Sequence, residues 1–539
     1  MKFNLSSLSI LLFTFLLVNS GCEKKLNELP LNSLSDETVF TTPERALAAL
    51  NGVYDAAQSG VYPGGNRGYV FGAANVQQGD IRGEDMLNIA AFYEFTYQGT
   101  YNSGTLNNNN YFINLYRLIN FANVAIEGFK KAGAAGIITP TLALQYEAEC
   151  RFLRAIAHHE LVIFFCRPFL DGNGDKTGLP YREVAINTGS LVDQARTIPR
   201  GTVAEVYTKL LADLDFAETN LPATLPAGQS STIRPLRAAA IVAKMKARMH
   251  MGQWAQVRTE GNKLVPATVN PLAPTTVVSV IGAHSLTSTP NGSFASNSLS
   301  TENIWTIKND PLDNPGANGA LAAMYGSNDL LGRGLVAVSP IIWNNTGWRA
   351  DDLRRTALYR NGTNANAVTA IMTTKYFDYV ARGDNNPIYR WPEVLLMHAE
   401  AECRLTTGVS QRAIDLLNVV RNRSIPNPSA NQYVATNFAD QTELLNAILL
   451  ERRIEFCAEG KRWSDIHRLV QDPITAVRPV GIPAKVASRA QAASFGLYGI
   501  GVPVTLGQPS IPYSDFRFIW PIPAEEVAQN PVITQNPGY

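Results

Sequence analysis

The sequence lacks any excess of charge. It has 46 Lys and Arg against 45 Asp and Glu in 539 residues, so its formal net charge is +1. It also lacks a basic run interleaved with aromatic residues, which is the electrostatic footprint of binding to a phosphate backbone. These absences exclude a nucleic-acid partner. The hydrophobic content of 45% indicates instead a globular body with a substantial core.

Residue types that carry catalytic and metal chemistry are scarce as well. Of the six histidines, His159 could begin a zinc-protease motif, but Ile163 stands where that motif needs its second histidine. No G-x-S-x-G motif or phosphate-binding glycine loop is present. We therefore expect no catalytic residue, no metal site and no cofactor. Four cysteines form no C-x-x-C pair, which favours buried free thiols; they are Cys150, Cys166, Cys403 and Cys457.

The turn "DGNGDKTG", residues 171–178, is similar to the start of a calcium loop. Oxygen-bearing side chains alternate from Asp171 through Asp175. However, Lys176 replaces the glycine at the sixth position of such a loop, and Arg182 stands where the bidentate glutamate is needed. The pattern favours a solvated turn, and calcium binding at Asp171–Asp175 stays open.

Only one segment is strongly apolar, and it lies at the start of the chain. Its run from Leu8 to Val18 follows Lys2 and is too short to span about 30 Å of hydrocarbon as a helix. Residues 1–21 therefore read as a signal peptide. Because Ser20 and Gly21 precede Cys22, the pattern resembles a bacterial lipobox, which predicts lipidation of Cys22 and a mature chain of residues 22–539. The alternative is an ordinary signal peptide that is cut nearby.

Helical periodicity dominates several blocks and predicts paired helices. "PEVLLMHAEAECRL" is followed by a turn and by "QRAIDLLNVVRNR", and "RAAAIVAKMKARMHM" is followed by "QWAQVRTEGNKLV". Each pair has the length of a tetratricopeptide-like hairpin. Further helices are predicted at 44–57, 111–131, 141–165, 202–219 and 441–459. We expect an all-α fold of four such hairpins, with the scaffold mainly in residues 40–58, 111–265 and 389–470.

Two long stretches, residues 60–110 and 266–388, show little helical period. Loops well beyond about 15 residues are uncommon in compact domains unless they bind a ligand or are disordered. Both stretches contain many aromatic residues, which argues against disorder. We therefore expect them to form a loop-rich ligand-binding region beside the helical scaffold.

A stripe of three glutamates, Glu451, Glu455 and Glu459, lies at successive spacings of four in the helix predicted at 441–459. Carboxylates on one helix face could bind a metal or serve as the acid and base of a glycoside hydrolase. Five cationic residues stand nearby in sequence, and repulsion between like charges at this spacing amounts to only a few tenths of a kcal/mol. An ion-pair network that joins helices is the favoured interpretation.

Several motifs together resemble the SusD/RagB family in order and spacing. They are "CEKKLNELPLNSLSDETVF" at the predicted lipidated start, "EAECRFLRAIAHHELVIFF", "RWPEVLLMHAEAECRL" followed by "LLNVVRNR", "ERRIEFCAEGKRWSDIHRL", and the C-terminal "WPIP...NPVITQNPGY". The resemblance covers nearly the whole mature chain. The proline-rich segment 518–539 is its most specific part, because a general helical repeat protein has no reason to end in that way.

The resemblance implies a surface-exposed lipoprotein of a Gram-negative outer membrane. Such proteins bind oligosaccharides, or peptides in some branches, and cover a TonB-dependent transporter of the SusC type. They are not enzymes. Their fold has four tetratricopeptide-like hairpins beside a loop-rich region, and it implies that the tail 518–539 lies along the scaffold with Trp520 and Tyr539 as apolar anchors. A peptide-binding member of the same family and a secreted helical glycoside hydrolase are the alternative functions.

The family motifs mark scaffold, so the ligand residues must be inferred from composition. Sugars are bound by aromatic faces and by planar polar groups. Trp254, Trp391, Trp463 and Trp520 fall in helical or tail motifs and are expected in the core. The candidate ligand residues in loop-rich sequence are Trp343, Trp348, Asn344, Arg349, Trp305, Tyr69, Asn75, Asp80 and Arg82. The alternative is that these side chains pin long loops to the scaffold.

Overall fold

The computed structural model describes residues 38–62, 65–224, 232–268, 277–295, 299–487 and 495–539. The predicted signal segment 1–21 and the predicted lipidation site Cys22 lie outside the described residues.

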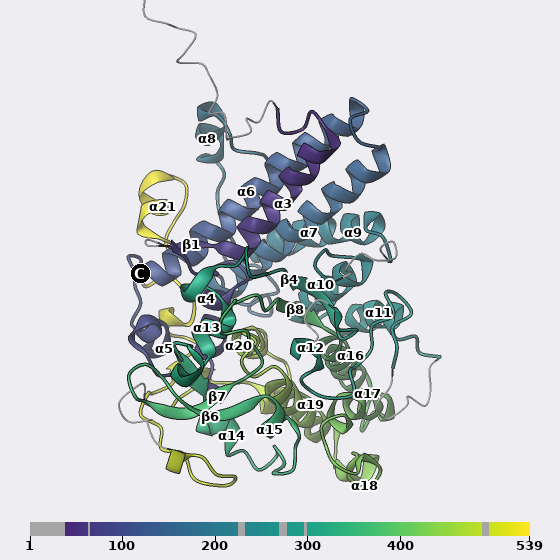
Figure 1. Ribbon diagram of the computed structural model, residues 1–539, viewed down its shortest axis with the longest axis vertical. Helices are drawn as coiled ribbons and strands as arrows, with labels where there is room; N and C mark the ends of the chain where they lie inside the picture. Colours follow the sequence, from purple (N-terminus) through teal and green to yellow (C-terminus); the bar gives the residue numbers. More distant parts are fainter. Residues whose placement is uncertain (1–37, 63–64, 225–231, 269–276, 296–298, 488–494) are drawn as a thin grey trace, which may run out of the picture.

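Long helices form the scaffold, and most of them pack on the next long helix along the chain. In order they are α3 (Pro43–Ser59), α6 (Leu106–Ala134), α7 (Pro140–Phe165), α9 (Val203–Asn220), α10 (Arg237–His250), α11 (Trp254–Leu264), α16 (Trp391–Leu405), α17 (Gln411–Asn422) and α19 (Gln441–Glu455). Contacts run from α3 through α6, α7, α9, α10 and α11 to α16, which packs on both α17 and α19. Figure 1 shows α3, α6, α7 and α9 in the upper half and α16, α17 and α19 in the lower half. This succession is the stacking of a helical repeat, and the predicted all-α fold is confirmed.

The starts of these helices follow from local sequence. Thr42 and Thr139 cap α3 and α7 by accepting hydrogen bonds from backbone N–H groups, and a proline follows each cap. Proline suits this position because the N–H that it lacks would have no partner in the helix. Thr202 and Glu205 form a reciprocal capping box at α9. The predicted helix 111–131 starts earlier than expected, at Leu106.

The expectation that residues 60–110 lack a helix is wrong. Helix α4 (Ala73–Ile81) lies there, followed by the shorter α5 (Glu94–Gln98). Every residue of α4 except Asn75 is buried. A helix surrounded by protein has no solvent-facing side, so its sequence shows no alternation of apolar and polar faces. The periodicity test therefore missed it.

Short strands and helices lie in the loop-rich stretches and in the segments between and after the scaffold helices. Antiparallel pairs join β1 (Val61–Tyr62) to β2 (Gly65–Asn66), β3 (Met86–Asn88) to β5 (Val336–Val338), β4 (Asn303–Ile307) to β8 (Asn386–Arg390), β6 (Tyr359–Thr363) to β7 (Thr369–Thr373) and β9 (Gly481–Ile482) to β10 (Ile511–Pro512). Short helices are α8 (Gly189–Ala195), α12 (Gly292–Ala295), α13 (Leu321–Tyr325), α14 (Pro340–Trp343), α15 (Arg354–Ala357), α18 (Pro428–Asn431), α20 (Arg462–Leu469) and α21 (Ala524–Gln529). Because β3 pairs with β5, the two loop-rich stretches meet directly.

The glutamate stripe lies inside a buried ion cluster, although the predicted helix 441–459 ends at Glu455 and Glu459 lies beyond it. We use this name for Glu302, Glu451, Glu455, Glu459, Arg354, Lys375, Arg390 and Arg423, none of which is more than 6% exposed. Glu455 accepts hydrogen bonds from Arg423 at 2.8 Å, Arg354 at 3.0 Å and Arg390 at 3.1 Å. The interpretation as an ion-pair network is confirmed, but the cations come from distant segments. The five cationic residues near the stripe in sequence pair with other carboxylates instead.

Opposite charges in this cluster stabilise the ionised forms of one another. Burial opposes ionisation of Glu455, but the charges of Arg423, Arg390 and Arg354 outweigh it and hold its pKa well below the usual range. Among the described residues, Glu451 pairs with Arg354 alone, and burial raises its pKa. The cluster joins the scaffold helix α19 to β8 at Arg390 and to α15 at Arg354, and both of these elements belong to the loop-rich side.

The C-terminal tail lies on the scaffold as expected. Trp520 is fully buried, with its ring 4.5 Å from that of Phe164, and its backbone N–H donates to the Phe164 carbonyl. The Asn536 amide donates to the carbonyls of Phe165 and Trp520, which holds the turn of the tail in place. Tyr539 is partly buried, packs its ring against Phe516 and donates to the Ile519 carbonyl.

Other expectations about isolated residues also hold. Cys150, Cys166, Cys403 and Cys457 are free and buried. His159 hydrogen-bonds the Tyr207 hydroxyl, and His158 stacks on Tyr181 with ring centroids 3.8 Å apart. In the part of the chain that the structure describes, no helix combines the length and the apolar character needed to cross a bilayer.

We predict that Glu455→Gln strongly destabilises the protein. Removing one partner of a buried ion network leaves the remaining charges uncompensated, which costs about 3 to 5 kcal/mol. Thermal unfolding should show a marked fall in Tm. Glu525→Gln on the exposed surface of α21 is the control and should leave Tm unchanged. Equal Tm values for the two variants would contradict the role assigned to the cluster.

Candidate functional site

The predicted pair Trp343 and Trp348 forms part of a packed aromatic cluster. Their rings lie 5.3 Å apart, and the Arg355 guanidinium lies 4.6 Å from the first and 4.3 Å from the second. Trp348 has no exposed surface, whereas Trp343 is half-buried. Trp348 therefore cannot offer a stacking face to a ligand, because its side chain is part of the core.

The polar residues beside this pair have structural partners as well. The Asn344 amide donates to the carbonyls of Leu497 and Val502, and its oxygen accepts from the Gly499 N–H. It therefore pins the segment around Leu497 to the core. Arg349 is paired with Asp351 at 2.8 Å at the surface and is half-buried. Asn344 therefore pins a loop to the scaffold, which is the alternative to a role in ligand binding.

The remaining candidates are mostly core residues too. Trp305 is fully buried, with the Phe152 ring 5.0 Å away, and the buried Tyr69 donates to Asn107. Asp80 accepts hydrogen bonds from the Tyr325 hydroxyl and the Gly460 N–H, and burial raises its pKa to about 8. Because these three side chains are at most 1% exposed, the structure contradicts their assignment as ligand contacts.

Arg82 is held in an aromatic box. Its guanidinium lies 3.9 Å from the Trp463 ring and 5.1 Å from the Trp520 ring, and it donates to the Phe518 carbonyl at 2.6 Å. It has no exposed surface. Arg82 therefore ties the end of α4 to the C-terminal tail, and its assignment as a ligand contact is also wrong.

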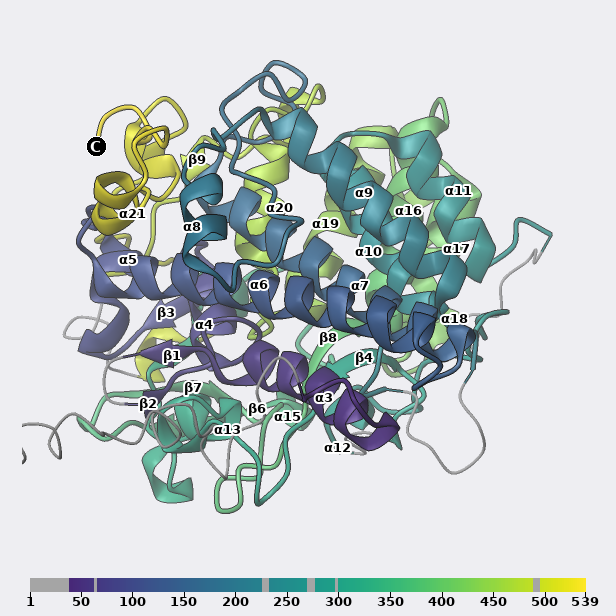
Figure 2. The same ribbon diagram turned by 90° about the horizontal axis from the view of Figure 1, so that it is seen from above.

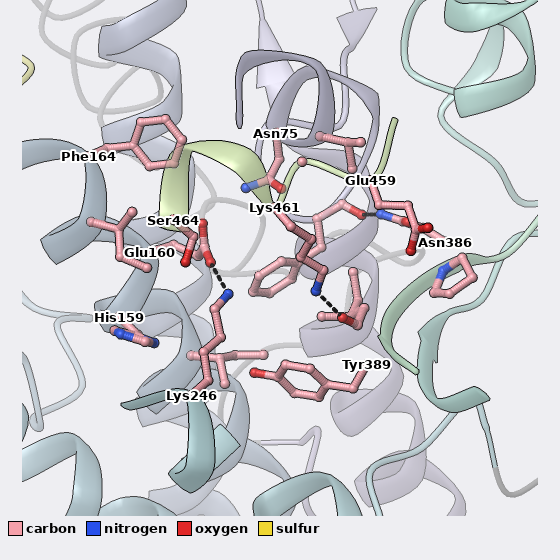
Figure 3. Close-up of a pocket in the computed structure, with 17 residues that line it drawn as sticks. Asn75, His159, Glu160, Phe164, Lys246, Asn386, Tyr389, Glu459, Lys461 and Ser464 are labelled. Carbon is pink, nitrogen blue, oxygen red and sulfur yellow. Dashed lines mark hydrogen bonds and ion pairs between the residues drawn. The ribbon is translucent and has the colours of Figure 1, made fainter. Parts of the chain in front are cut away.

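Asn75 is the one half-buried residue of α4, and it borders an enclosed polar cavity (Figure 3). Lys246 and Glu160 pair across this cavity at 3.4 Å, and Lys461 donates to the Ile388 carbonyl at 2.6 Å. The cavity measures about 40 Å³. That volume accommodates about three water molecules at most, so the cavity is too small for a sugar.

An open depression of about 280 Å³ lies at the junction of the scaffold with the loop-rich region. It is lined by Asn51, Tyr54, Asp55, Gln58, Ile233, Arg234, Ile307, Lys308 and Asp313. Four of these residues come from one side of α3, at the spacing of successive helical turns. The depression combines a half-buried tyrosine ring with planar amide, carboxylate and guanidinium groups, which are the groups that bind sugar hydroxyls.

Buried Glu149 holds the floor of this depression in place. It accepts a hydrogen bond from the Tyr54 hydroxyl at 2.5 Å and another from Arg234 Nε at 2.9 Å. Asp55 on the rim is exposed, and its pKa is raised by burial of its surroundings and by the nearby charge of Asp313. The floor is therefore rigid, while the rim presents acceptor oxygens to solvent.

The loop 308–319 runs from this depression to a second group of polar residues. At one end, Gln58 donates to the carbonyls of Lys308 and Asp313. At the other end, the Gly319 carbonyl accepts from the Ala73 N–H, and Asn318 accepts from Arg333. The Arg67 guanidinium lies 5.1 Å from the centre of the Phe92 ring. Figure 2 shows β2 beside α13, the elements that flank this end of the loop.

We use the name loop-308 surface for the residues at the two ends of this loop, which are Asn51, Tyr54, Asp55, Arg234, Arg67, Phe92, Asn318 and Arg333. It brings together residues from the end of α3 and from both loop-rich stretches. None of its residues was among the candidates from sequence. The polar stripe of Asn51, Asp55 and Gln58 on a predicted helix was the available signal, whereas the contributions of Phe92 and Arg333 depend on tertiary contacts alone.

Two further open depressions are weaker candidates for a ligand-binding site. One, of about 260 Å³, lies along α6 at Phe112 and Tyr116 and is lined mostly by apolar residues. The other, of about 400 Å³, is lined without any aromatic ring. Its Arg453 and Arg462 already pair with Asp85 and Glu84. The first depression also contains Asn120, Arg182 and Glu526, but Asn120 and Arg182 already donate to the backbone carbonyls of Ile186 and Ala195.

No metal centre is evident among the described residues, where no three His, Cys, Asp or Glu side chains gather around one point. At the turn similar to a calcium loop, Asp171 accepts from the Tyr513 hydroxyl at 2.6 Å and pairs with Lys176 at 3.5 Å.

The fold and this surface define a class of protein: a tetratricopeptide-like helical scaffold with a loop-rich second region. Two family models match the chain and together cover most of it. The model described as "SusD family" matches residues 342–539, and the model described as "Starch-binding associating with outer membrane" matches residues 48–246. The chain belongs to the SusD/RagB family.

Relatives and solved structures agree with this assignment over nearly the whole chain. SusD-like proteins P2 and P38 of Formosa agariphila are each 24% identical, and the alignments cover 98% and 100% of this chain and 99% and 100% of theirs. A SusD superfamily protein from Bacteroides fragilis superposes with a TM-score of 0.72 at 23% identity, over 92% of this chain and 100% of that one. A SusD-like carbohydrate binding protein from Bacteroides vulgatus has a TM-score of 0.68 at 18% identity, over 91% and 97%.

We predict that Trp348→Ala acts on stability. Removing a fully buried tryptophan leaves a cavity beside Arg355 and costs about 3 to 5 kcal/mol. Thermal unfolding should show a large fall in Tm, whereas Phe377→Ala, which removes an exposed ring, should leave Tm nearly unchanged. An unchanged Tm for Trp348→Ala would show that the ring is not part of the core.

Proposed function

We propose that the protein is a lipid-anchored, outer-membrane binding protein for oligosaccharides, which it delivers to a TonB-dependent transporter of the SusC type. The observation that carries the binding role is the loop-308 surface. There, Tyr54 and the polar groups of Asn51, Asp55 and Arg234 surround an open depression of about 280 Å³. An aromatic ring accommodates the C–H face of a pyranose, and planar polar groups pair with its hydroxyls.

The comparisons support a saccharide as the ligand. One matching family model is described as starch-binding and associated with the outer membrane. One solved structure with the same fold is called a carbohydrate binding protein. Transfer to a SusC-type transporter rests on the family resemblance. A peptide ligand is the alternative within the family, and a glycan array with a matched peptide panel would separate the two.

The structure offers no support for the glycoside hydrolase alternative. The glutamate stripe that motivated it is at most 6% exposed and paired with arginines and a lysine in the buried ion cluster. A catalytic carboxylate must reach the glycosidic bond that it protonates or attacks. Glu451, Glu455 and Glu459 cannot reach a substrate in this arrangement.

We predict that Asp55→Ala weakens oligosaccharide binding about tenfold or more, because a charged acceptor for sugar hydroxyls is lost. Calorimetric titration with a ligand identified on a glycan array measures the affinity. Tm should be unchanged, because the Asp55 side chain is exposed.

Asp193→Ala serves as the matched control. Asp193 is an exposed aspartate on α8, outside the loop-308 surface. If Asp55→Ala bound the ligand as tightly as Asp193→Ala, the assignment of the binding site to the depression would be wrong.

We predict that Cys22→Ser abolishes membrane anchoring. The thiol of Cys22 is the expected site of lipid attachment, so its loss should move the protein from outer membranes to soluble fractions or leave unprocessed precursor. Cell fractionation with immunoblotting measures both outcomes. Cys150→Ser changes a buried thiol and is the control. Processed Cys22→Ser protein that stayed in the outer membrane would refute the anchor assignment.

A further inference from the structure

The depression of about 280 Å³ beside α3 is lined by two cations, and both already have a carboxylate partner. Arg234 donates from Nε to Glu149 at 2.9 Å and from Nη2 to the other oxygen of the same carboxylate. Lys308 pairs with Asp310 at 2.9 Å. A guanidinium that donates two parallel hydrogen bonds to one carboxylate is held in a fixed geometry. The positive charges of the depression are therefore balanced by the protein itself.

The two carboxylates that line the same depression, Asp55 and Asp313, lack such a partner. Both residues are exposed, and neither carboxylate makes an ion pair or a hydrogen bond in the part of the chain that the structure describes. Burial, and then the charge of Asp313, raise the pKa of Asp55, and the charge of Arg117 offsets this rise only in part. Two like charges in one depression favour a ligand of opposite charge.

A third acceptor in the depression belongs to a buried side chain. Gln58 is only 5% exposed, and its Nε2 donates to the carbonyls of Lys308 at 2.9 Å and Asp313 at 3.3 Å. Because carbonyl oxygens only accept, these two contacts fix which end of the amide is the nitrogen. Its Oε1 accepts no hydrogen bond among the described residues, although the side chain lines the depression. A polar atom on so deeply buried a side chain ordinarily has a partner.

The groups left for a ligand are therefore mainly acceptors. The Tyr54 hydroxyl donates to Glu149 at 2.5 Å, so this donor is also engaged with a protein carboxylate. The exposed Asn51 amide can both donate and accept, and it favours neither kind of ligand group. A sugar hydroxyl donates one hydrogen bond, whereas an ammonium donates three and adds a positive charge. The carboxylates and the Gln58 oxygen thus match an ammonium better than a hydroxyl.

We propose that the depression binds the ammonium group of an amino sugar, with Asp55 and Asp313 as its counter-charges and Gln58 as a neutral acceptor. This inference rests on the proposed function and narrows its ligand to oligosaccharides that carry free amino groups. Hydrogen bonds between an ammonium and a carboxylate are stronger than those between neutral groups. The same two carboxylates repel saccharides that carry uronate or sulfate groups, which adds to the selectivity.

Calorimetric titration with four oligosaccharides of equal length and linkage tests the proposal. They are built from glucosamine, N-acetylglucosamine, glucose and glucuronate. The first two differ only in the acetyl group, and the glucose oligomer controls for the bulk of that group. The titrations are made at about pH 6, where carboxylates and sugar amines are largely charged, with a chelator present so that no divalent cation bridges the carboxylates.

We expect the glucosamine oligomer to bind the native protein about tenfold more tightly than the glucose oligomer, because its amine makes charge-assisted hydrogen bonds. The glucuronate oligomer should bind most weakly. The preference for glucosamine should weaken as salt is raised, because ions screen a charged contact between exposed groups.

Variants at Asp313 sharpen the test, and the ratio of the affinities for glucosamine and glucose oligomers is the readout. Asp313→Asn should lower this ratio several-fold, whereas Asp313→Glu should keep part of it because it retains the charge. Asp193→Asn removes the charge of an exposed aspartate on α8, and this control should leave the ratio as it is in the native protein. Thermal unfolding of each variant checks that the fold is intact.

The outcomes separate the two levels of the proposal. If the glucosamine oligomer binds no more tightly than the glucose oligomer, or if the ratio is unchanged in folded Asp313→Asn, the amino-sugar inference is overturned and saccharide binding still stands. Absence of binding to every oligosaccharide, with binding to the peptide panel, overturns the proposed function as well. A preference for the glucuronate oligomer would also overturn the inference, because it requires a free cation in the site.

Discussion

The buried ion cluster is the interaction on which the arrangement of the two halves of the molecule depends. Two of its four glutamates, Glu451 and Glu455, project from the scaffold helix α19. Arg354, Lys375 and Arg390 come from segments of the loop-rich side. Charges at this depth are stable only when each has a partner, because removing them from water costs several kcal/mol per ion. The cluster therefore permits essentially one docking of the loop-rich side on the scaffold.

A second set of contacts, made by Arg82 and Asp80, attaches the C-terminal tail and α4 to the same scaffold. Arg82 lies among Trp463, Trp520, Tyr101 and Phe164 and bonds to the tail backbone at Phe518. Two residues earlier, Asp80 bonds to Tyr325 at the end of α13 and to Gly460 beyond α19. Helix α4 thus connects the tail, the loop-rich side and the scaffold. The loop-308 surface lies directly beside it, because the N–H of Ala73 at the start of α4 donates to the Gly319 carbonyl.

This arrangement explains why most aromatic residues in the loop-rich sequence do not face solvent. Long loops contain few backbone hydrogen bonds of their own, so buried aromatic rings and amide side chains hold them in place. Trp348, Trp305 and Asn344 do this. The surface left for a ligand is consequently built from half-buried residues such as Tyr54, Phe92 and Arg333, whose partners hold them without covering them.

The sequence alone predicted the helical hairpins and an ion-pair network at the glutamate stripe, and the resemblance to the SusD/RagB family implied that the tail docks on the scaffold. The hairpins follow from apolar spacing within a few turns, which can be read along a chain. The cations that pair with Glu455, which are Arg423, Arg390 and Arg354, lie 32, 65 and 101 residues away and could not be identified in this way. Helix α4 was not predicted, because it is buried on all sides and its sequence shows no alternation of apolar and polar faces. Which tryptophans face a ligand, and which side chains of α3 meet the loop 308–319, was decided only by the tertiary structure. Exposure depends on contacts between residues hundreds of positions apart, such as the hydrogen bond from Gln58 to the Lys308 carbonyl, and no local pattern encodes them.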